Sequence, residues 1–96
     1  MNKEPAVYIL ASANKQVLYV GVTSQLVTRV WQHKNNLVSG FSKKYQVHHL
    51  VHYEQFDTML AAIEREKQLK KWCRAWKEQL IIDNNPQWLD LYDSLL

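Results

Sequence analysis

The pattern of apolar and polar positions along the first quarter of the chain predicts a β-hairpin. Two runs rich in β-branched and aromatic residues, residues 6–11 (AVYILA) and 16–22 (QVLYVGV), flank the polar segment SANK. Two such runs around a short polar turn are typical of adjacent antiparallel strands. A turn centred on the middle of this segment would place Tyr8 directly opposite Tyr19, an arrangement that packing alone often produces.

The next part of the chain predicts a helix, a loop and a third strand. A helix over about residues 25–36 begins at a Thr or Ser cap and carries one apolar stripe. That stripe consists of Leu26, Val30 and Leu37. Residues 35–44 (NNLVSGFSKK) predict a loop, and residues 47–56 (VHHLVHYEQF) predict a strand whose register stays open, because histidines and apolar residues are mixed in it. Its histidines show no metal-ligand spacing and are expected on the strand surface: His48, His49 and His52.

Helices fill the rest of the chain. Asp57 or Thr58 caps a helix that runs to about Trp72, and a further helix covers about residues 74–82 until the segment DNNP ends it. Residues 87–96 (QWLDLYDSLL) predict a short terminal helix packed through its apolar positions. The order of two strands, a helix, a strand and two helices predicts a small α+β domain, with a mixed or antiparallel sheet covered by helices.

Length and composition bound the class of protein. The 96 residues suffice for one domain, spanning residues 1–96, and are too few for two independent cores. The single cysteine, Cys73, excludes an internal disulfide and a cluster of cysteines around a metal. Apolar runs reach only about six residues, and the N-terminal MNKEPAV lacks the apolar segment of a signal peptide. We therefore expect a cytoplasmic protein with no membrane partner.

Basic charge is concentrated in the middle of the chain. The net charge is +3, but residues 29–77 carry ten Lys and Arg against four Asp and Glu, a balance of +6. A phosphate-binding surface needs such a concentration, although a solvated helix face produces the same pattern. The candidates for nucleic-acid contact are Lys34, Lys43, Lys44, Lys67, Lys70, Lys71, Arg74 and Lys77.

One carboxylate falls on the apolar face of the second long helix. At 100° per residue, Glu66 lies in the middle of an apolar arc, whereas Glu64 lies on the polar side. The arc is formed by Met59, Ala62, Leu69 and Cys73. A carboxylate that faces a sheet is costly unless it is paired or binds a cation. Glu66 is therefore a candidate metal ligand, and an ion pair with Arg29 or a lysine is the alternative.

Further candidate chemistry lies near the hairpin. Arg29 and His33 are four residues apart and share one helix face. Arginine offers a fixed fork of donors to phosphate oxygens and histidine moves protons near neutral pH, although an exposed pair on a helix edge is common. Gly21 removes a side chain from the end of its strand, which permits a bulge or the close approach of another group. With the two tyrosines and Glu66, these groups could bind one divalent metal ion, orient water and hold a phosphate.

The order and spacing of these residues resemble the GIY-YIG nuclease superfamily. The matching features are Tyr8, the segment YVG at residues 19–21, Arg29 eight residues after the glycine, His33, and Glu66 in a later helix. The segments GFSKKYQV, REKQLKKW and NPQWLDLY are similar to one subgroup, so the resemblance covers almost the whole chain. The chain is similar to small stand-alone bacterial members, which are related to the N-terminal nuclease module found in excinuclease ABC.

The resemblance implies a three-stranded antiparallel sheet with flanking helices and a role for each matching residue. Tyr8 and Tyr19 would orient or deprotonate the attacking water, and Arg29 would hold the scissile phosphate. Glu66 would be the sole protein ligand of one Mg²⁺ or Mn²⁺ ion. His33 would assist proton transfer or contact the phosphate.

The chain departs from the family pattern beside Gly21, which would lie at the nucleic-acid-binding surface. Val22 stands where excinuclease-type modules carry a lysine that could perturb a tyrosine. Without that lysine, the general base could be Tyr19 or His33, because an unperturbed tyrosine is a poor base at neutral pH.

These implications predict a divalent-metal-dependent endonuclease that hydrolyses phosphodiester bonds in DNA, with RNA left open as a substrate and a structure-selective preference suggested by family analogy. Two alternatives stay open. One is a nucleic-acid-binding module of the same fold with little or no catalysis, and the other is an interaction protein whose residues 87–96 dock a protein partner that supplies targeting.

Four aromatic side chains could stack on unpaired bases, with packing between helices as the alternative for the last two. They are Trp31, Phe41, Trp72 and Trp76.

Overall fold

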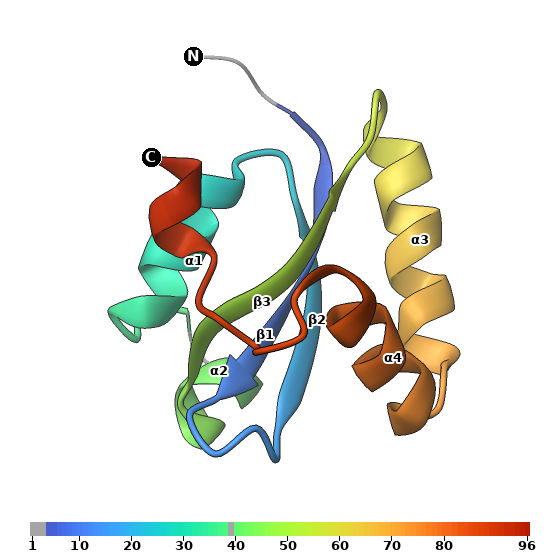
Figure 1. Ribbon diagram of the computed structural model, residues 1–96. Coiled ribbons are helices and arrows are strands. Elements are labelled where there is room, and N and C mark those ends of the chain that lie inside the picture. Colours follow the sequence, from blue (N-terminus) through green and yellow to red (C-terminus); the bar gives the residue numbers. More distant parts are fainter. Residues whose placement is uncertain (1–3, 39) are drawn as a thin grey trace.

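The sheet follows the predicted strands. In the computed structural model, which describes residues 4–38 and 40–96, strand β1 (Ala6–Ser12) pairs antiparallel with β2 (Leu18–Thr23) on one side and β3 (Val47–Gln55) on the other. The sheet order is therefore β2–β1–β3 (Figure 1). This arrangement confirms the three-stranded antiparallel sheet with flanking helices that the resemblance implies.

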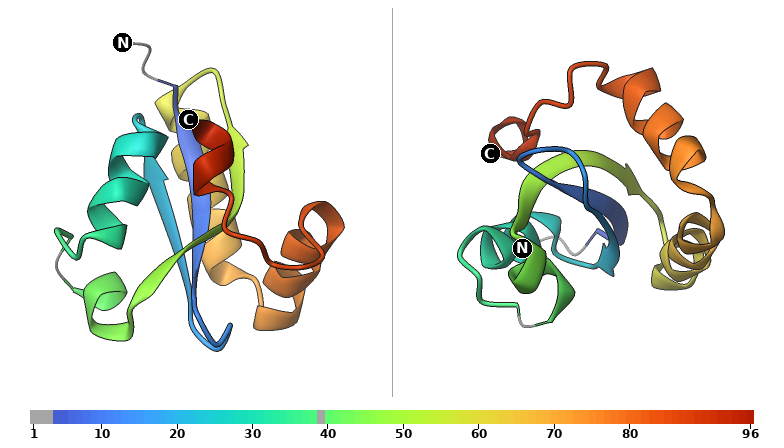
Figure 2. Two further views of the ribbon diagram at one scale, coloured as in Figure 1. Left: turned by 60° about the vertical axis from the view of Figure 1, so that its left-hand side comes forward. Right: turned by 90° about the horizontal axis from the view of Figure 1, so that it is seen from below.

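Helices cover both faces of the sheet. Helix α1 (Leu26–Lys34) lies on one face, whereas α3 (Met59–Lys71) and α4 (Arg74–Asn84) lie on the opposite face (Figures 1 and 2). The short helix α2 (Phe41–Tyr45) precedes β3, and a 3-10 turn, η1 (Tyr92–Leu95), ends the chain. Within residues 4–38 and 40–96, no helix has the length and apolar character that a membrane span requires.

A side-chain cap sets the start of α3, whereas α1 begins after Gln25 with no side-chain cap, so the Thr or Ser cap predicted for it is wrong. Thr58 is extended, and its side chain accepts a hydrogen bond from the backbone N–H of Ala61, which confirms it as the cap of α3. Trp72 returns to extended φ and ψ angles of −68° and 147°, so α3 ends there and the chain turns directly into α4. Residues 35–44, predicted as a loop, instead contain most of α2, and residues 87–96 form only the turn η1 instead of a helix.

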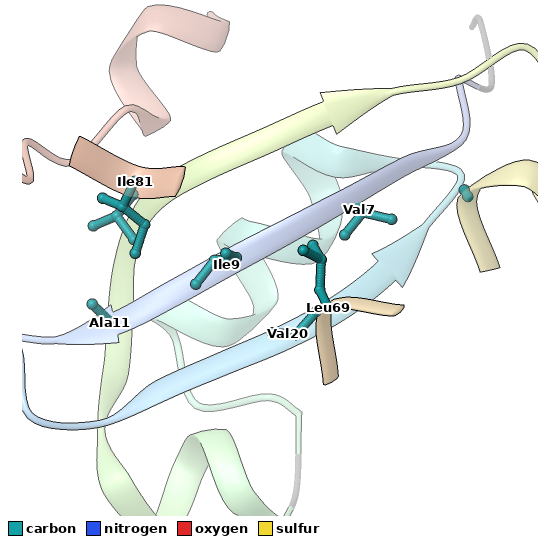
Figure 3. Packing of buried hydrophobic residues seen from close by; sticks show 8 residues of the cluster. Val7, Ile9, Ala11, Val20, Leu69 and Ile81 are labelled. Atoms are coloured by element: carbon teal, nitrogen blue, oxygen red, sulfur yellow. The ribbon is translucent and has the colours of Figure 1, made fainter. Parts of the chain in front are cut away.

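Strand β1 is buried on both faces, which explains its unbroken apolar sequence. Val7, Ile9 and Ala11 face α3 and α4, in a cluster with Val20, Val51, Ala62, Leu69 and Ile81 (Figure 3). Ala6, Tyr8 and Leu10 face α1, in a cluster with Leu26, Val30, Val47 and Leu50. Tyr8 thereby brings a hydroxyl group into the core on the α1 face.

Strand β3 carries two irregularities that break the alternation of its sequence. Its register against β1 shifts after Ile9 and again after Ala11. Each shift adds one residue to β3, so the residues that pack on the α1 face are three apart instead of two. These residues are Val47, Leu50 and Tyr53.

The burial of Leu37 and of His52 differs from what the sequence predicts. Leu37 is 63% exposed, because α1 ends at Lys34 and the predicted apolar stripe does not reach it. His52, expected on the strand surface, lies opposite Ile9 and is buried. Its burial is tolerated because Glu54 accepts a hydrogen bond from its ring. The other two histidines of β3 are half-buried: His48 and His49.

The C-terminal segment covers the free edge of β3 (Figure 2). Leu50 accepts a hydrogen bond from the backbone N–H of Leu91 at 2.7 Å and donates its own N–H to the Asp90 carboxylate at 3.1 Å. Asn85, which is 4% exposed, bonds through its side chain to backbone groups of β3 and of the segment itself. These contacts to the edge of β3 fix the conformation of the segment up to η1. The sequence predicts a terminal helix packed through its apolar positions instead. Removal of residues 87–96 would therefore expose that edge.

Asn85→Ala is expected to lower the free energy of unfolding by about 2 kcal/mol, because backbone groups of Val51 and Leu89 lose their partners. Asn84→Ala is the matched control, since this neighbouring side chain is exposed, and it should cost less than about 0.5 kcal/mol. Urea unfolding followed by circular dichroism measures both. Equal effects of the two substitutions would show that Asn85 does not anchor the segment.

Candidate active site

Tyr8 and Tyr19 lie on the same face of the hairpin but are not directly opposite. Tyr8 pairs instead with Gly21, so the predicted pairing is wrong by two residues. The pairing ends at Ala11 and Leu18, which makes the connection longer than the turn that the sequence predicts. Because a shift of two residues preserves the face, the two tyrosine ring centroids still lie 6.2 Å apart.

Gly21 provides the space in which the Tyr8 ring lies. A Cβ atom at this position would be 2.4 Å from both Cζ and Oη of Tyr8, far inside van der Waals contact. The pairing of β1 with β2 is regular on both sides of Gly21, so the glycine does not mark a bulge. Of the two roles that the sequence allows for this glycine, the structure selects the close approach of another group, and that group is the Tyr8 phenol.

The Tyr8 hydroxyl reaches helix α1 and forms a hydrogen bond with Nε2 of His33 at 2.9 Å. Both side chains are 2% exposed, and the His33 ring centroid lies 5.3 Å from that of Tyr19. Burial, followed by the nearby charges of Arg29 and His48, lowers the pKa of His33 to about 4, so its ring is neutral at pH 7. Burial, reinforced by Tyr19, raises the pKa of Tyr8. The inner pair is therefore uncharged at neutral pH.

Three further site residues surround this pair and are half-buried: Tyr19, Arg29 and Glu66. The Arg29 charge acts on both buried groups, because it lowers the pKa of His33 and opposes the rise in the pKa of Tyr8. Arg29 also lines a polar surface hollow of about 260 Å³ with hydroxyl and amide side chains from the start of α1. Tyr8 and His33 thus form a buried inner layer of the candidate site. Tyr19, Arg29 and Glu66 form an outer layer that a substrate can reach.

Glu66 is turned inward, as its helical spacing predicts. Its side chain is 16% exposed, whereas Glu64 is exposed on the same helix. Its charge contributes to the raised pKa of Tyr8, so the carboxylate lies within electrostatic reach of the tyrosine. A lysine supplies the ion-pair partner, since Lys70 Nζ lies 3.6 Å from Oε1 of Glu66.

The apolar arc around Glu66 is narrower than predicted. Its buried members in α3 are Ala62 and Leu69. Met59 is 37% exposed, and Cys73 is exposed because it lies beyond the end of α3. The inward position of Glu66 therefore rests on two apolar neighbours rather than four.

Glu66 alone could offer a carboxylate to a metal ion at this site. Across residues 4–38 and 40–96, no group of three or more His, Cys, Asp or Glu side chains could hold a metal. Mg²⁺ commonly binds through one or two carboxylates and completes its coordination with water and substrate phosphates. The donor set fits such an ion, with Lys70 as a competitor for the same carboxylate.

Two of the predicted nucleic-acid contacts hold the fold together. Lys34 donates a hydrogen bond to the carbonyl of His48 at 2.9 Å and pairs with Asp90. The Arg74 guanidinium donates to two carbonyl oxygens of the β1–β2 connection. Four other lysines that we expect to contact nucleic acid are exposed: Lys43 and Lys44 on α2, and Lys70 and Lys71 on α3. Gly21 is buried beneath Tyr8.

A charged network on the opposite face of the sheet is not evident from the sequence. His52 Nε2 donates to Glu54 Oε2 at 2.8 Å, and Arg65 Nε donates to Glu54 Oε1 at 2.8 Å. These hydrogen bonds, the one from His52 first, hold the pKa of Glu54 down to about 2. The network ties β3 to the turn of α3 that carries Glu66. Its one sequence signal is the spacing of His52 and Glu54 by two, which places both on one face of a strand.

Comparison with known proteins finds relatives along most of the chain. Residues 4–79 match the family model of the GIY-YIG catalytic domain. A UPF0213 protein of Natronomonas pharaonis is 36% identical over 80% of this chain and 89% of its own length. A UPF0213 protein of Syntrophus aciditrophicus is 37% identical over 81% of this chain and 90% of its own length.

A solved structure shares the fold. The solution NMR structure of a UPF0213 protein from Bacillus halodurans has a TM-score of 0.58 against this chain. The likeness covers 91% of this chain and 92% of that one at 23% sequence identity. At 23% identity, this likeness shows that the two proteins share the arrangement of the sheet and helices, and nothing about their activity.

The neutral state of His33 makes the stability of the fold depend on pH. The unfolded chain binds a proton at this histidine near pH 6.5, whereas the folded protein binds it only near pH 4. As the pH falls from about 6.5 to about 4, the unfolded state gains protons first, and the free energy of unfolding decreases. His33→Gln is expected to remove the decrease that His33 causes between about pH 6.5 and 4. Above pH 6.5, the pH dependence of the free energy of unfolding should stay as in the wild type.

An NMR titration of the His33 ring protons measures the pKa directly, and urea unfolding at several pH values measures its consequence. Glu54 acts in a separate window, because its pKa of about 2 means that its stabilising contribution is lost between about pH 4.5 and 2. A His33 ring that titrates near pH 6.5 would contradict the closed inner layer.

Proposed function

Because this chain belongs to the GIY-YIG family, we propose that it is a divalent-metal-dependent endonuclease that hydrolyses phosphodiester bonds in DNA. The observation that supports the proposal most strongly is one cluster of side chains contributed by β1, β2, α1 and α3. It combines a buried Tyr8–His33 pair with a half-buried tyrosine, an arginine and a single inward glutamate. These groups can orient water, bind a phosphate and hold a cation, which in-line hydrolysis of a phosphodiester requires.

The outer layer contacts the substrate in the proposed mechanism. Arg29 binds the scissile phosphate and stabilises the negative charge on its oxygens in the transition state. The Tyr19 hydroxyl oxygen accepts a hydrogen bond from the attacking water and orients it. Glu66 holds one Mg²⁺ or Mn²⁺ ion, which when bound supplies stabilisation of the charge that develops on the leaving oxygen.

The inner layer positions Tyr19. His33 is buried and its Nε2 is bonded to Tyr8, so a direct contact between His33 and the substrate would require the site to open. Its pKa of about 4 also makes His33 a weak base at neutral pH. Of the two candidates for general base, we therefore favour Tyr19, which takes the proton of the attacking water in its phenolate form, with Tyr8 and His33 as positioning residues.

In the proposed mechanism, Arg29 is the positive charge near the tyrosines in place of the lysine that this chain lacks after Gly21. Val22, at that position, packs against the core cluster on the face of α3 and α4. The Arg29 charge favours the ionised form of Tyr8, which is the effect that a lysine beside the tyrosines would have.

The pair between Lys70 and Glu66 supports a second candidate function, a nucleic-acid-binding module without catalysis. In such a module, Lys70 would keep the carboxylate paired and no metal ion would bind. The Lys70 side chain is 53% exposed and the separation is 3.6 Å, so this is a surface pair worth less than about 1 kcal/mol. A divalent cation can displace it, and we therefore place the nuclease first.

Glu66→Gln is expected to lower the rate of DNA cleavage by about 100-fold or more, because it removes the only carboxylate of the cluster and with it the metal ligand. Labelled single-stranded, duplex, flap and branched DNA, with RNA alongside, are incubated with Mg²⁺, Mn²⁺ or EDTA. The wild-type protein should cut DNA with a divalent metal and not with EDTA.

Glu64→Gln is the matched control, since it removes the same charge from an exposed position two residues away on α3. It should leave the rate within about twofold of the wild type, as expected for a surface substitution. Equal cutting by the wild type and Glu66→Gln would reject the catalytic role assigned to Glu66. DNA binding without cutting in every metal would reject the endonuclease and leave the binding module.

A further inference from the structure

A row of aromatic rings leads from the candidate active site to the protein surface. The Tyr19 ring stacks on Phe41 of α2, with 6.1 Å between the ring centroids and 27° between the ring planes. The Phe41 ring centroid in turn lies 4.7 Å from that of Tyr45. Phe41 is 47% exposed and Tyr45 is 43% exposed, so each presents much of its ring to solvent. The first ring of the row belongs to the site and the last two are accessible.

Basic side chains surround the two exposed rings. Lys44 Nζ lies 5.3 Å from the centroid of the Tyr45 ring, and Lys43 is exposed on the same short helix. A surface groove of about 380 Å³ lies beside them and is lined by Phe41, Tyr45, Arg74, Lys77 and residues 16–18. Figure 1 shows α2 near the end of the hairpin, which places this groove at one end of the sheet.

We propose that Phe41 and Tyr45 form a subsite that stacks an unpaired base of a DNA strand next to the cleaved phosphate. The inference rests on the proposed function, because the subsite adjoins Tyr19, to which we assign the attacking water. Aromatic side chains flanked by positive charge bind single strands by stacking on the bases while lysines attract the phosphates.

The subsite selects the structure of the substrate. A base in a continuous duplex has both faces covered by its neighbours and must be extruded at a cost before it can stack on a protein ring. A base in a single strand or a flap offers its face without that cost. The protein should therefore bind unpaired DNA more tightly than duplex of the same length.

The tryptophans suggested by the sequence fit this role less well. Trp72 packs against the core, with the Arg65 guanidinium over its ring at 5.0 Å. Trp76 is 60% exposed but meets Trp72 edge-on, and it lies on α4. Trp31 is 49% exposed on α1. Phe41 differs from all three because its ring stacks on a residue of the candidate site.

The variants Phe41→Leu and Phe41→Tyr separate stacking from apolar contact. Leucine keeps an apolar side chain but has no aromatic face, whereas tyrosine keeps the ring. Binding of fluorescein-labelled oligo(dT) of about 12 nucleotides is measured by fluorescence anisotropy in EDTA, so that no cleavage occurs. Phe41→Leu should weaken binding by about tenfold and Phe41→Tyr by less than about twofold.

Three control oligonucleotides separate base stacking from phosphate binding, and DNA from RNA. An abasic strand of the same length carries the phosphates without the bases, and a duplex hides the base faces, so neither should respond to Phe41→Leu. Equal binding of oligo(dT) by the two variants, or an equal response of the abasic strand, would overturn the subsite. Oligo(U) distinguishes RNA from DNA: the proposal expects the DNA strand to bind at least as tightly, and binding of RNA alone would overturn it.

Cleavage separates this proposal from the proposed function. If binding depends on Phe41 but no metal supports cleavage, the subsite stands and the endonuclease is rejected. If DNA is cut in a Glu66-dependent manner but Phe41→Leu binds like the wild type, the endonuclease stands and the subsite is rejected. Circular dichroism verifies that the variants are folded, and Tyr45→Leu against Tyr45→Phe repeats the comparison at the second ring.

Discussion

The contact between Tyr8 and Gly21 is the constraint on which the candidate active site depends. Because Gly21 has no side chain, the Tyr8 ring lies against β2 and its hydroxyl reaches His33 on α1. That hydrogen bond joins the central strand to the helix that carries Arg29. The same ring lies beside Tyr19, two positions before the glycine on β2. One absent Cβ atom therefore allows residues from three elements to meet.

Burial separates the inner layer, which holds the candidate site together, from the half-buried outer layer, which can contact a substrate. Burial, with the Arg29 charge nearby, keeps His33 neutral, so the arginine is not accompanied by a second positive charge behind the tyrosines. Glu66 depends on contacts made on the other face of the sheet, because the preceding residue, Arg65, is bound to Glu54 of β3. The carboxylate is thus fixed relative to the sheet that carries the tyrosines.

The apolar pattern predicts the elements because most of them bury regular faces, and it also predicts Glu66 as an inward residue. The sequence leaves Asp57 and Thr58 as candidates for the cap of α3, and the structure selects Thr58. The apolar pattern fails where one or two residues are inserted. A longer turn pairs Tyr8 with Gly21, and two register shifts in β3 place the residues of its α1 face three apart instead of two. A period of two residues cannot reveal an inserted residue, since every position after it changes face. The hydrogen bond between Tyr8 and His33 depends on tertiary packing and has no local sequence signal.

The most direct test of this account is the pKa of His33 in Gly21→Ala, measured by NMR titration of its ring. The added Cβ atom must displace the Tyr8 ring, which opens the inner layer to water and removes much of the burial that lowers the pKa of His33. The account predicts that this pKa rises from about 4 toward 6.5, with a loss of about 1–3 kcal/mol in the free energy of unfolding. A His33 pKa that stays near 4 in a variant of unchanged stability would contradict the claim that this one contact assembles the site.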